Sequence, residues 1–329
     1  MLYHLYTADH LSCEGFMQIL LCLCLCLLSL TQILHAEPRS LVKLNGKEYM
    51  VYYNDGDSFR VLAGDLSGSK ARLGGFNTLE SYGPVHSWGD WTTKELYVIA
   101  KMGTYNARKG VWDCTSDLKK DTYGRTLWRC PELSADQIRK GLAHAMSITA
   151  DSAHPDDVQA QKEARQNKRG MWAHGIPEYV LTSIHSVNER SGDRPAYNRL
   201  VSSIDGHSLK WKHRDVYEEC QNVCWKPTPA DQQKRFTQRW RKRVGASAEA
   251  YSESDAQKIT AYFLEHKKQI QTIDGITWND TQDVKAINKV LEAMKEEGWV
   301  DAALSDVQTC MIYVDFRRRF GTGRAVCLK

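Results

Sequence analysis

The sequence predicts an α+β fold, in which a small β-barrel with packed helices is followed by a mostly helical region. After residue 40, short runs of strand-forming residues separated by turn signals predict about five strands. Helix patterns with start and stop signals follow them. Short strands and then helices, within about 130 residues, are typical of an OB-type five-stranded barrel. Further along the chain, apolar residues recur at helical spacing.

Each strand of the barrel is expected where β-branched and aromatic residues lie between turns. The expected strands are 41–53, 58–63, 71–76, 110–115 and 126–130. A helix is expected over 90–105, where apolar residues follow a helical period. Two more are expected over 134–145, with Ser134 as its N-cap, and over 155–172, which opens with Pro155.

The chain beyond residue 176 changes character. Residues 177–199 contain a polar stretch with Gly and Pro, so we expect a linker there. Residues 200–329 are expected to form a mostly helical, disulfide-containing domain whose role the sequence does not indicate. Its expected helices are 229–244, 252–271, 281–297 and 300–304, with a strand at 308–316.

The start of the chain is typical of an export signal. An uncharged apolar run over 16–34 is followed by the small residue Ala36 and then by polar sequence, which predicts a signal peptide over residues 1–36. Met17 opens the run and is an alternative start. We expect a secreted or periplasmic protein without stable membrane association after cleavage. The alternative is an N-terminal membrane anchor, because a run of about nineteen residues suffices to span a bilayer.

Composition and charge exclude a disordered chain without selecting a partner. Hydrophobic residues make up 42% and charged residues 26% of the 329 residues, which is enough apolar material for a core. The length favours two domains. A net charge of +4 is compatible with a polyanionic partner but does not require one.

Six of the ten cysteines lie after the leader, and an even number in an exported chain indicates disulfides. Cys114 and Cys130 lie in two expected strands that flank a turn, and their even separation lets both face one side of the hairpin. We expect a disulfide between them. Three pairings stay open for Cys220, Cys224, Cys310 and Cys327. A zinc site at Cys220 and Cys224 is the alternative, which an oxidising compartment disfavours.

Three short polar segments combine carboxylates with two separated arginines. They are 54–58 (Asn-Asp-Gly-Asp-Ser), 72–80 and 121–125 (Asp-Thr-Tyr-Gly-Arg). Hydrolysis of a phosphodiester adds negative charge to the phosphoryl oxygens, which two guanidiniums can bind. A hard cation polarises the phosphate, and a carboxylate orients the attacking water. Each segment alone is also typical of a solvated turn or a surface ion pair, but their order and spacing favour such a site.

These segments resemble the staphylococcal nuclease (thermonuclease-like) family. Its D-G-D-[TS] turn, R-x-x-x-x-D-T-P-E segment and D-x-Y-G-R turn match 55–58, 72–80 and 121–125. Its V-x-x-G-L-A helix and its A-x-x-x-A-[RK]-x-x-x-x-G-[LMI]-W helix match 138–143 and 160–172. The resemblance implies an OB-type barrel with packed helices, which the strand pattern also predicts.

The resemblance covers residues 41–176 and implies catalytic roles for matching residues. Arg72 and Arg125 match the two phosphate-binding arginines, and Glu80 matches the glutamate that acts on the attacking water. Tyr123, in the same turn as Arg125, is expected to contact substrate. The implied activity is that of a secreted endonuclease, a phosphodiesterase with DNA and RNA as substrates. No protein partner is implied.

The resemblance also implies a calcium site. Asp57 matches a metal-ligand aspartate, Thr78 the residue that offers its carbonyl, and Asp55 a supporting neighbour. Asn77 stands where the family has a second ligand aspartate, so we expect weaker Ca²⁺ binding or tolerance of another divalent cation. Leu79 replaces the family's proline, which leaves the following loop less restrained.

Two other interpretations stay open. The barrel can be a non-catalytic nucleic-acid-binding or interaction module. The basic stretch 234–243 can hold single-stranded nucleic acid through its cations and through Phe236 and Trp240, or it is an amphipathic helix with both rings in the core. The three arginines 317–319 present the same alternatives. The C-terminal region can also dock on an envelope or partner surface.

Overall fold

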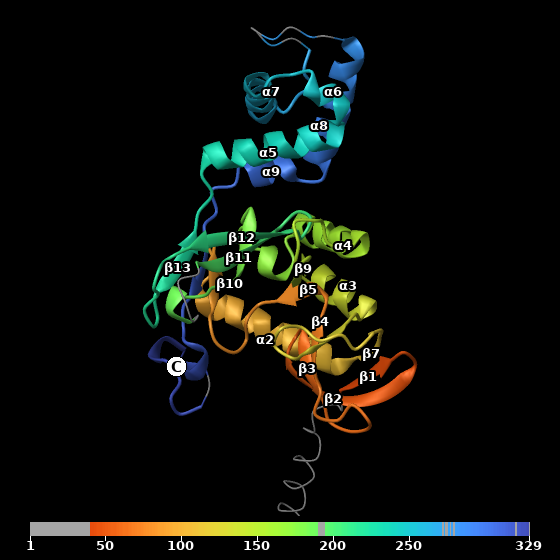
Figure 1. Cartoon of the computed structure of the whole chain (residues 1–329), viewed down its shortest axis with the longest axis vertical. Coiled ribbons are helices and arrows are strands. Elements are labelled where there is room, and N and C mark those ends of the chain that lie inside the picture. Colours follow the sequence, from red (N-terminus) through yellow and green to blue (C-terminus); the bar gives the residue numbers. More distant parts are fainter. Residues whose placement is uncertain are drawn as a thin grey trace, which may run out of the picture. The chain divides into compact units, whose positions relative to one another are not determined.

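The structure is a computed structural model that describes residues 40–189, 195–271, 273, 276, 278, 280–319 and 321–328. The predicted signal peptide or anchor, 1–36, lies outside the described residues, as does part of the predicted linker. Residues from 40 onward form one compact unit. Its described part contains eight α-helices and fourteen strands, which confirms a mixed α+β class (Figure 1). Within that part, no helix is long and apolar enough to cross a membrane.

The largest sheet has six strands in the order β7-β1-β2-β3-β4-β8 and is curled into a half-barrel. In chain order these strands are β1 Leu41–Leu44, β2 Lys47–Asp55, β3 Ser58–Val61, β4 Lys70–Leu73, β7 Val111–Cys114 and β8 Thr126–Trp128. The sequence predicts one strand where β1 and β2 lie. Asn45 and Gly46 have positive φ angles and turn that stretch into a hairpin.

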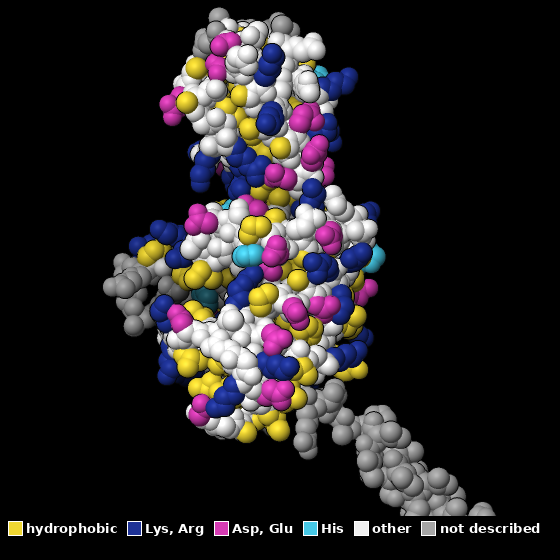
Figure 2. All heavy atoms as spheres, turned by 90° about the vertical axis from the view of Figure 1, so that its right-hand side faces the viewer, with side chains coloured by type: hydrophobic (Ala, Val, Ile, Leu, Met, Phe, Trp, Pro, Cys, Tyr) yellow, Lys and Arg dark blue, Asp and Glu magenta, His cyan; other side chains and the backbone are white. Residues whose placement is uncertain are grey.

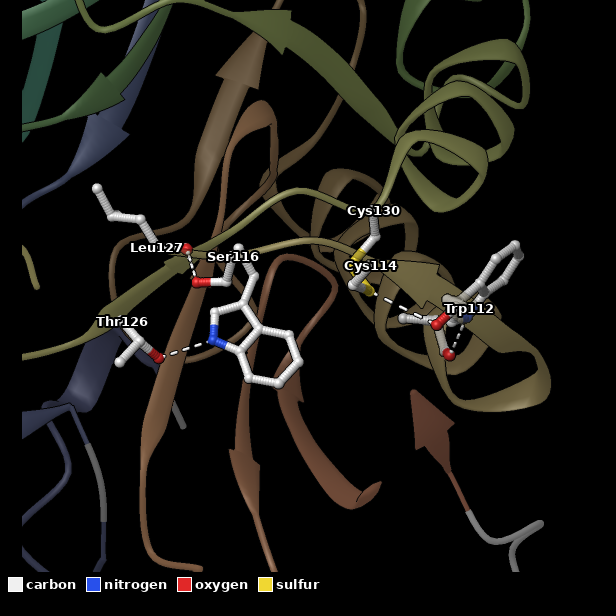
Figure 3. The surroundings of a disulfide bond; sticks show 8 residues. Trp112, Cys114, Ser116, Thr126, Leu127 and Cys130 are labelled. Carbon is white, nitrogen blue, oxygen red and sulfur yellow. Dashed lines mark hydrogen bonds between the residues drawn. A yellow bond between two sulfur atoms is a disulfide. The ribbon is translucent and has the colours of Figure 1, made fainter. Parts of the chain in front are cut away.

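The two outer strands of this sheet meet at one end. Thr115 and Arg129 form an isolated bridge just beyond β7 and β8. The predicted disulfide between Cys114 and Cys130 is present at the same place (Figure 3). The hydroxyl of Ser116 donates to the carbonyl of Leu127 at 2.6 Å beside it. The disulfide therefore holds the end of β7 against the end of β8, the strand that follows the turn with Arg125.

Alternate residues of the sheet point into one apolar core, as the two-residue period of a strand requires. In β2, Tyr49, Val51 and Tyr53 are buried, and Met50 and Tyr52 between them are exposed. This alternation is readable in the sequence, which is why the strand pattern of the first part is predictable.

Three helices belong to the same part of the chain: α2 Thr93–Lys109, α3 Pro131–Arg139 and α4 Pro155–Gln166. Thr92 caps α2 in a reciprocal capping box with Glu95. The 3₁₀ turn η1, Gly170–Trp172, follows α4, and Trp172 is fully buried. The predicted helices at these places are confirmed for α2 and α4, with shifts at their ends.

The helix predicted over 134–145 is wrong in its bounds. It begins at Pro131, which suits the first turn because it needs no backbone donor there. Ser134 is therefore inside α3, where its hydroxyl donates to Asp157 at 2.6 Å instead of capping. The end of the predicted helix is strand β9, Ala143–Met146, which pairs antiparallel with β5, Gly75–Thr78.

The predicted linker and the start of the predicted helical domain contain strands. A three-stranded sheet has the order β10-β11-β12, with the bounds Tyr179–Ser183, Ala196–Ser202 and Ser208–His213. The turn η2, Val187–Glu189, lies between the first two. In β10 every residue but the last is buried, so the run lacks the alternation that identifies a half-exposed strand in sequence.

The predicted helices of the C-terminal region are confirmed, although the helix predicted over 252–271 ends five residues early, at His266. They are α5 Pro229–Val244, α7 Glu253–His266, α8 Thr281–Glu296 and α9 Trp299–Ala303, with a short α6 at Ala246–Glu249. α5 matches its predicted range residue for residue, because Thr228 caps it and Gly245 follows its end. Phe236 and Trp240 pack in the core of this helical part.

A small sheet joins distant parts of the chain. It has the order β13-β14-β6, with the bounds Asn222–Trp225, Thr309–Ile312 and His86–Trp88. The turns η3, Phe316–Arg318, and η4, Val326–Leu328, follow β14. Cys224 is bonded to Cys310 and Cys220 to Cys327, which settles the open pairing and excludes the zinc alternative. Three disulfides are typical of an oxidising, extracellular-type compartment.

Candidate functional site

The residues predicted for the site lie on adjoining elements of the curled sheet. Asp57 lies in the turn between β2 and β3, and Arg125 lies in the turn that leads into β8. Arg72, on β4, is opposite Ser58 on one side and opposite Leu127 on the other. The strand register therefore puts Arg72 between the two turns.

Asp57 is the centre of a buried hydrogen-bond network with β4 and β5. Its side chain is an ion-pair partner of the Arg72 guanidinium, which also donates to Oδ1 of Asn77 at 2.5 Å. The Thr78 backbone N–H donates to the other carboxylate oxygen of Asp57 at 2.8 Å. The side-chain amide of Asn77 donates to the Thr78 carbonyl at 2.7 Å. Hydrogen bonds thus connect the three predicted metal ligands to one another and to Arg72.

The turn that carries Asp57 is closely packed, and this explains its glycine. A Cβ atom on Gly56 would lie 2.4 Å from Cγ2 of Thr78. The side-chain amide of Gln137, on α3, donates to the carbonyl of Gly103 at 2.8 Å and to that of Gly56 at 3.4 Å. Gln137 is fully buried and holds the turn against α2. No sequence motif marks it as part of the site.

The carboxylates of the site repel one another. Burial raises the pKa of Asp55, and the charges of Asp57 and Glu80 raise it further. Burial, and then the charge of Asp57, raises the pKa of Glu80 to about 7. Because the pKa values of these carboxyl groups stay raised, the region favours the approach of further positive charge.

Arg125 is held by its own turn. Asp121 accepts a hydrogen bond from Nε of Arg125 at 2.7 Å and from the backbone N–H groups of Arg125 and Tyr123 at 2.9 Å each. Tyr123 is 75% exposed, and its ring centroid lies 5.4 Å from the guanidinium carbon. The exposed ring is available for contact with a bound substrate.

Three guanidiniums act on the carboxyl of Glu80. The charges of Arg319, Arg72 and Arg125, in that order of effect, lower its pKa against the larger effects of burial and of Asp57. The structure therefore brings both predicted arginines near the predicted glutamate. A third arginine, Arg319, also acts on Glu80. It belongs to the run 317–319, for which the sequence left both a nucleic-acid-binding and a structural interpretation open.

Two buried histidines near the site carry no recognisable sequence signal. Nε2 of His86 accepts the backbone N–H of Glu80 at 3.2 Å, so this imidazole holds the Glu80 backbone. Burial, with the charge of His144 as a smaller cause, lowers the pKa of His86 to about 3. His144 lies opposite Asn77 in the β5–β9 pair, and burial lowers its pKa to about 4. Both rings are neutral at neutral pH.

The donor atoms fit a hard cation by type. Asp57, Asn77 and Thr78 offer a carboxylate, an amide oxygen and a carbonyl, which are the ligands that Ca²⁺ prefers. Within the described residues, no three His, Cys, Asp or Glu side chains gather as a metal-binding group. Of the predicted ligands Asp57, Asn77 and Thr78, only Asp57 has a side chain of these four types, and Asp55 is its acidic neighbour. The guanidinium of Arg72 contacts two of the three groups.

The basic helix α5 is packed as an amphipathic core helix. Phe236 is 3% and Trp240 is 0% exposed, so these rings are not surfaces for stacked bases. Arg235 pairs with Glu178 at 2.6 Å, as do other arginines of the helix with acidic neighbours. Basic and acidic side chains are interspersed on the face in Figure 2. Of the two interpretations of this stretch, the structure supports the core helix.

No model of a known protein family matches the chain, and no curated protein matches it either. Function therefore has to follow from the residues of the site and their geometry.

Proposed function

We propose that residues 41–176 form an OB-type barrel of the staphylococcal nuclease kind, and that the protein is an exported enzyme that hydrolyses phosphodiester bonds of DNA and RNA. One observation carries the proposal. The strand register puts Arg72 between the turns that carry Asp57 and Arg125, and Glu80 follows Thr78, whose backbone N–H donates to Asp57. The curled sheet with joined edges supports the barrel.

The side chains divide the reaction between them. Arg72 and Arg125 bind the phosphoryl oxygens and stabilise the charge that develops there. Glu80 accepts a proton from the attacking water, whose oxygen forms the new bond to phosphorus. The bond from phosphorus to the leaving sugar oxygen breaks, and that oxygen takes a proton from solvent. Arg72 exchanges its contacts with Asp57 and Asn77 for contacts with the phosphate.

A cation has a defined place in this proposal. Ca²⁺, or another divalent ion, would be held by the Asp57 carboxylate, the Asn77 amide oxygen and the Thr78 carbonyl, and would add positive charge beside the phosphate. Binding would free the Arg72 guanidinium from these oxygens, because both positive groups favour the same partners.

A second candidate function is binding of nucleic acid without cleavage. Two observations favour it over cleavage: the Arg72 guanidinium is engaged by Asp57 and Asn77, and the ring of Tyr123 is 75% exposed and available to a base. In that case the chain binds an oligonucleotide, and the phosphodiester bonds stay intact with or without Ca²⁺.

Incubation of the purified protein with plasmid DNA and end-labelled RNA, with Ca²⁺ and then with chelator, separates the two functions. A nuclease cleaves both substrates in the presence of the cation. Glu80→Gln is expected to lower the rate about a hundredfold or more. Glu48→Gln, at an exposed position of β2, is the matched control and keeps full activity. Intact substrate in every lane would contradict the nuclease function.

A further inference from the structure

The loop that follows Glu80 is bound to the far end of the chain. It leads into β6, which pairs antiparallel with β14, so that Ser87 lies opposite Cys310. Just before the strand, the N–H of Ile312 donates to the carbonyl of Val85 at 3.0 Å. The C-terminal segment therefore lies directly against the loop of the proposed general base.

Beyond β14, the chain brings the side chain of Arg319 onto this loop. A Cβ atom on Gly83 would lie 2.7 Å from Cδ and 3.0 Å from Cγ of Arg319, so the stem of the arginine packs where Gly83 has no side chain. Gly83 has φ +116°, a conformation that favours glycine. Nε of Arg319 donates to the carbonyl of Val314 at 3.4 Å. The stem is thus anchored on both sides.

A disulfide holds the described chain beyond Arg319, and the three arginines of the run have different surroundings. The Cys220–Cys327 disulfide ties the end of the chain to the start of β13. Arg318 forms an ion pair with Glu219, and Arg317 is exposed. Of the three consecutive arginines, the third contacts the loop after the proposed general base. A segment tied by a disulfide can present a cation with little loss of conformational entropy.

The contacts with Gly83 place the stem of Arg319 on the loop three residues after Glu80. The guanidinium is half-buried, so it keeps access to solvent. A guanidinium on this loop suits a polyanion, because its planar donors match phosphate oxygens.

We propose that Arg319 is a third phosphate-binding guanidinium of this site, which the C-terminal segment supplies and which binds a phosphodiester next to the one that is cleaved. The proposal rests on the proposed nuclease function. It also gives the C-terminal region a role, because β14 and the Cys220–Cys327 disulfide hold Arg319 against the loop after Glu80. The ligand is the backbone of a nucleic-acid strand, independent of base sequence.

The test compares Arg319→Gln, Arg319→Lys and the control Arg317→Gln, which removes an equal charge from the same segment. Glutamine retains most of the stem that packs on Gly83. Cleavage of single-stranded DNA and binding of a fluorescent oligonucleotide are measured across a range of NaCl concentrations. Arg319→Gln is expected to raise KM about tenfold at low salt, with kcat changed less. The slope of log affinity against log salt falls by about 0.7, because one phosphate contact is lost.

Arg319→Lys is expected to recover the slope, because the charge returns, and Arg317→Gln is expected to match the wild type. If Arg319→Gln gives the same KM and slope as Arg317→Gln, the proposal is wrong while the nuclease function stands. If the wild type binds but does not cleave, the nuclease function fails, and the binding slopes still decide on Arg319. A wild type that neither binds nor cleaves contradicts both. Thermal unfolding checks that the variants are folded.

Discussion

Two buried charged clusters in this protein differ in how their charges are compensated. In the cluster beside β3, β4 and β5, Asp55 and Asp57 lie near the engaged guanidinium of Arg72, and Glu80 is influenced by Arg319 and Arg125 as well. Burial and mutual repulsion raise the pKa of Asp55 and of Glu80. The negative charges of this cluster are incompletely balanced by the residues in contact with them.

The second cluster lies between α5 and the β10-β11-β12 sheet, and its charges are paired. Oδ1 of Asp205 lies 2.5 Å from Nδ1 of His207, and Oδ2 accepts from Arg239 at 2.8 Å and from Ser152 at 2.9 Å. The guanidinium carbon of Arg239 lies 3.7 Å from the ring centroid of Trp299. Burial would raise the pKa of Asp205, but His207 and Arg239 hold it well below its usual range.

The difference favours binding as the proposed role of the first cluster and stability as the role of the second. Unrelieved repulsion destabilises the fold and is typical of sites that await a charged ligand. A carboxylate with a lowered pKa stabilises the folded state instead. Substitutions in the first cluster should therefore change activity, and substitutions in the second should change stability.

The largest effect is expected at Arg125. Arg125→Ala removes a charge that stabilises the phosphoryl group, so kcat/KM should fall about a hundredfold or more. Lys119→Ala removes an equal charge from the same hairpin, where the side chain is 80% exposed, and should keep wild-type kinetics. Initial rates on plasmid DNA measure both. Equal activity of the two variants would contradict a catalytic role for the first cluster and its surroundings, because cleavage would then not need the Arg125 guanidinium.

A smaller change is expected at Asn77. Asn77→Asp adds a carboxylate to the oxygens near Asp57, so the Ca²⁺ concentration for half-maximal activity should fall about tenfold. Without cation, the added charge increases repulsion in the cluster, so the melting temperature in chelator should not rise. Calcium titration of cleavage and thermal unfolding measure the two effects. An unchanged calcium requirement would contradict the proposed role of Asn77.

The smallest effect is expected at Asp205, and it concerns stability. Because the folded-state pKa lies below the unfolded value of about 3.9, the stabilisation is fully present above that pH and is lost as the pH falls further. Asp205→Asn should lower the free energy of unfolding by about 2 kcal/mol at pH 7. The difference from wild type should shrink below pH 4. Urea unfolding at several pH values measures it, and a difference that grows in acid would contradict the pairing.

Local patterns in the sequence predict some elements because their causes are local. α5 is delimited by its cap and by the glycine after it, and its apolar residues follow a helical period. The turn at Asp57 is marked by a glycine that its close packing against Thr78 requires. The pairing of Cys114 with Cys130 follows from two strands joined by one turn.

Other elements escape prediction because tertiary contacts decide them. Residues 143–146 have helix-forming alanines, yet they form β9 because β5 offers a partner strand. β10 is buried along nearly its whole length, so its sequence lacks alternation. His86 is part of the site because β14 pairs with the strand that carries it.

The sequence by itself determined the residue types of the candidate site, the order of its segments and the turns that carry Asp57 and Arg125. These features depend on neighbours along the chain. Only the tertiary structure decided that Arg72 contacts Asp57 and Asn77, and that Arg319 packs on Gly83. The physical reason is that such contacts join residues distant in sequence, and the packing of whole sheets and disulfides selects them.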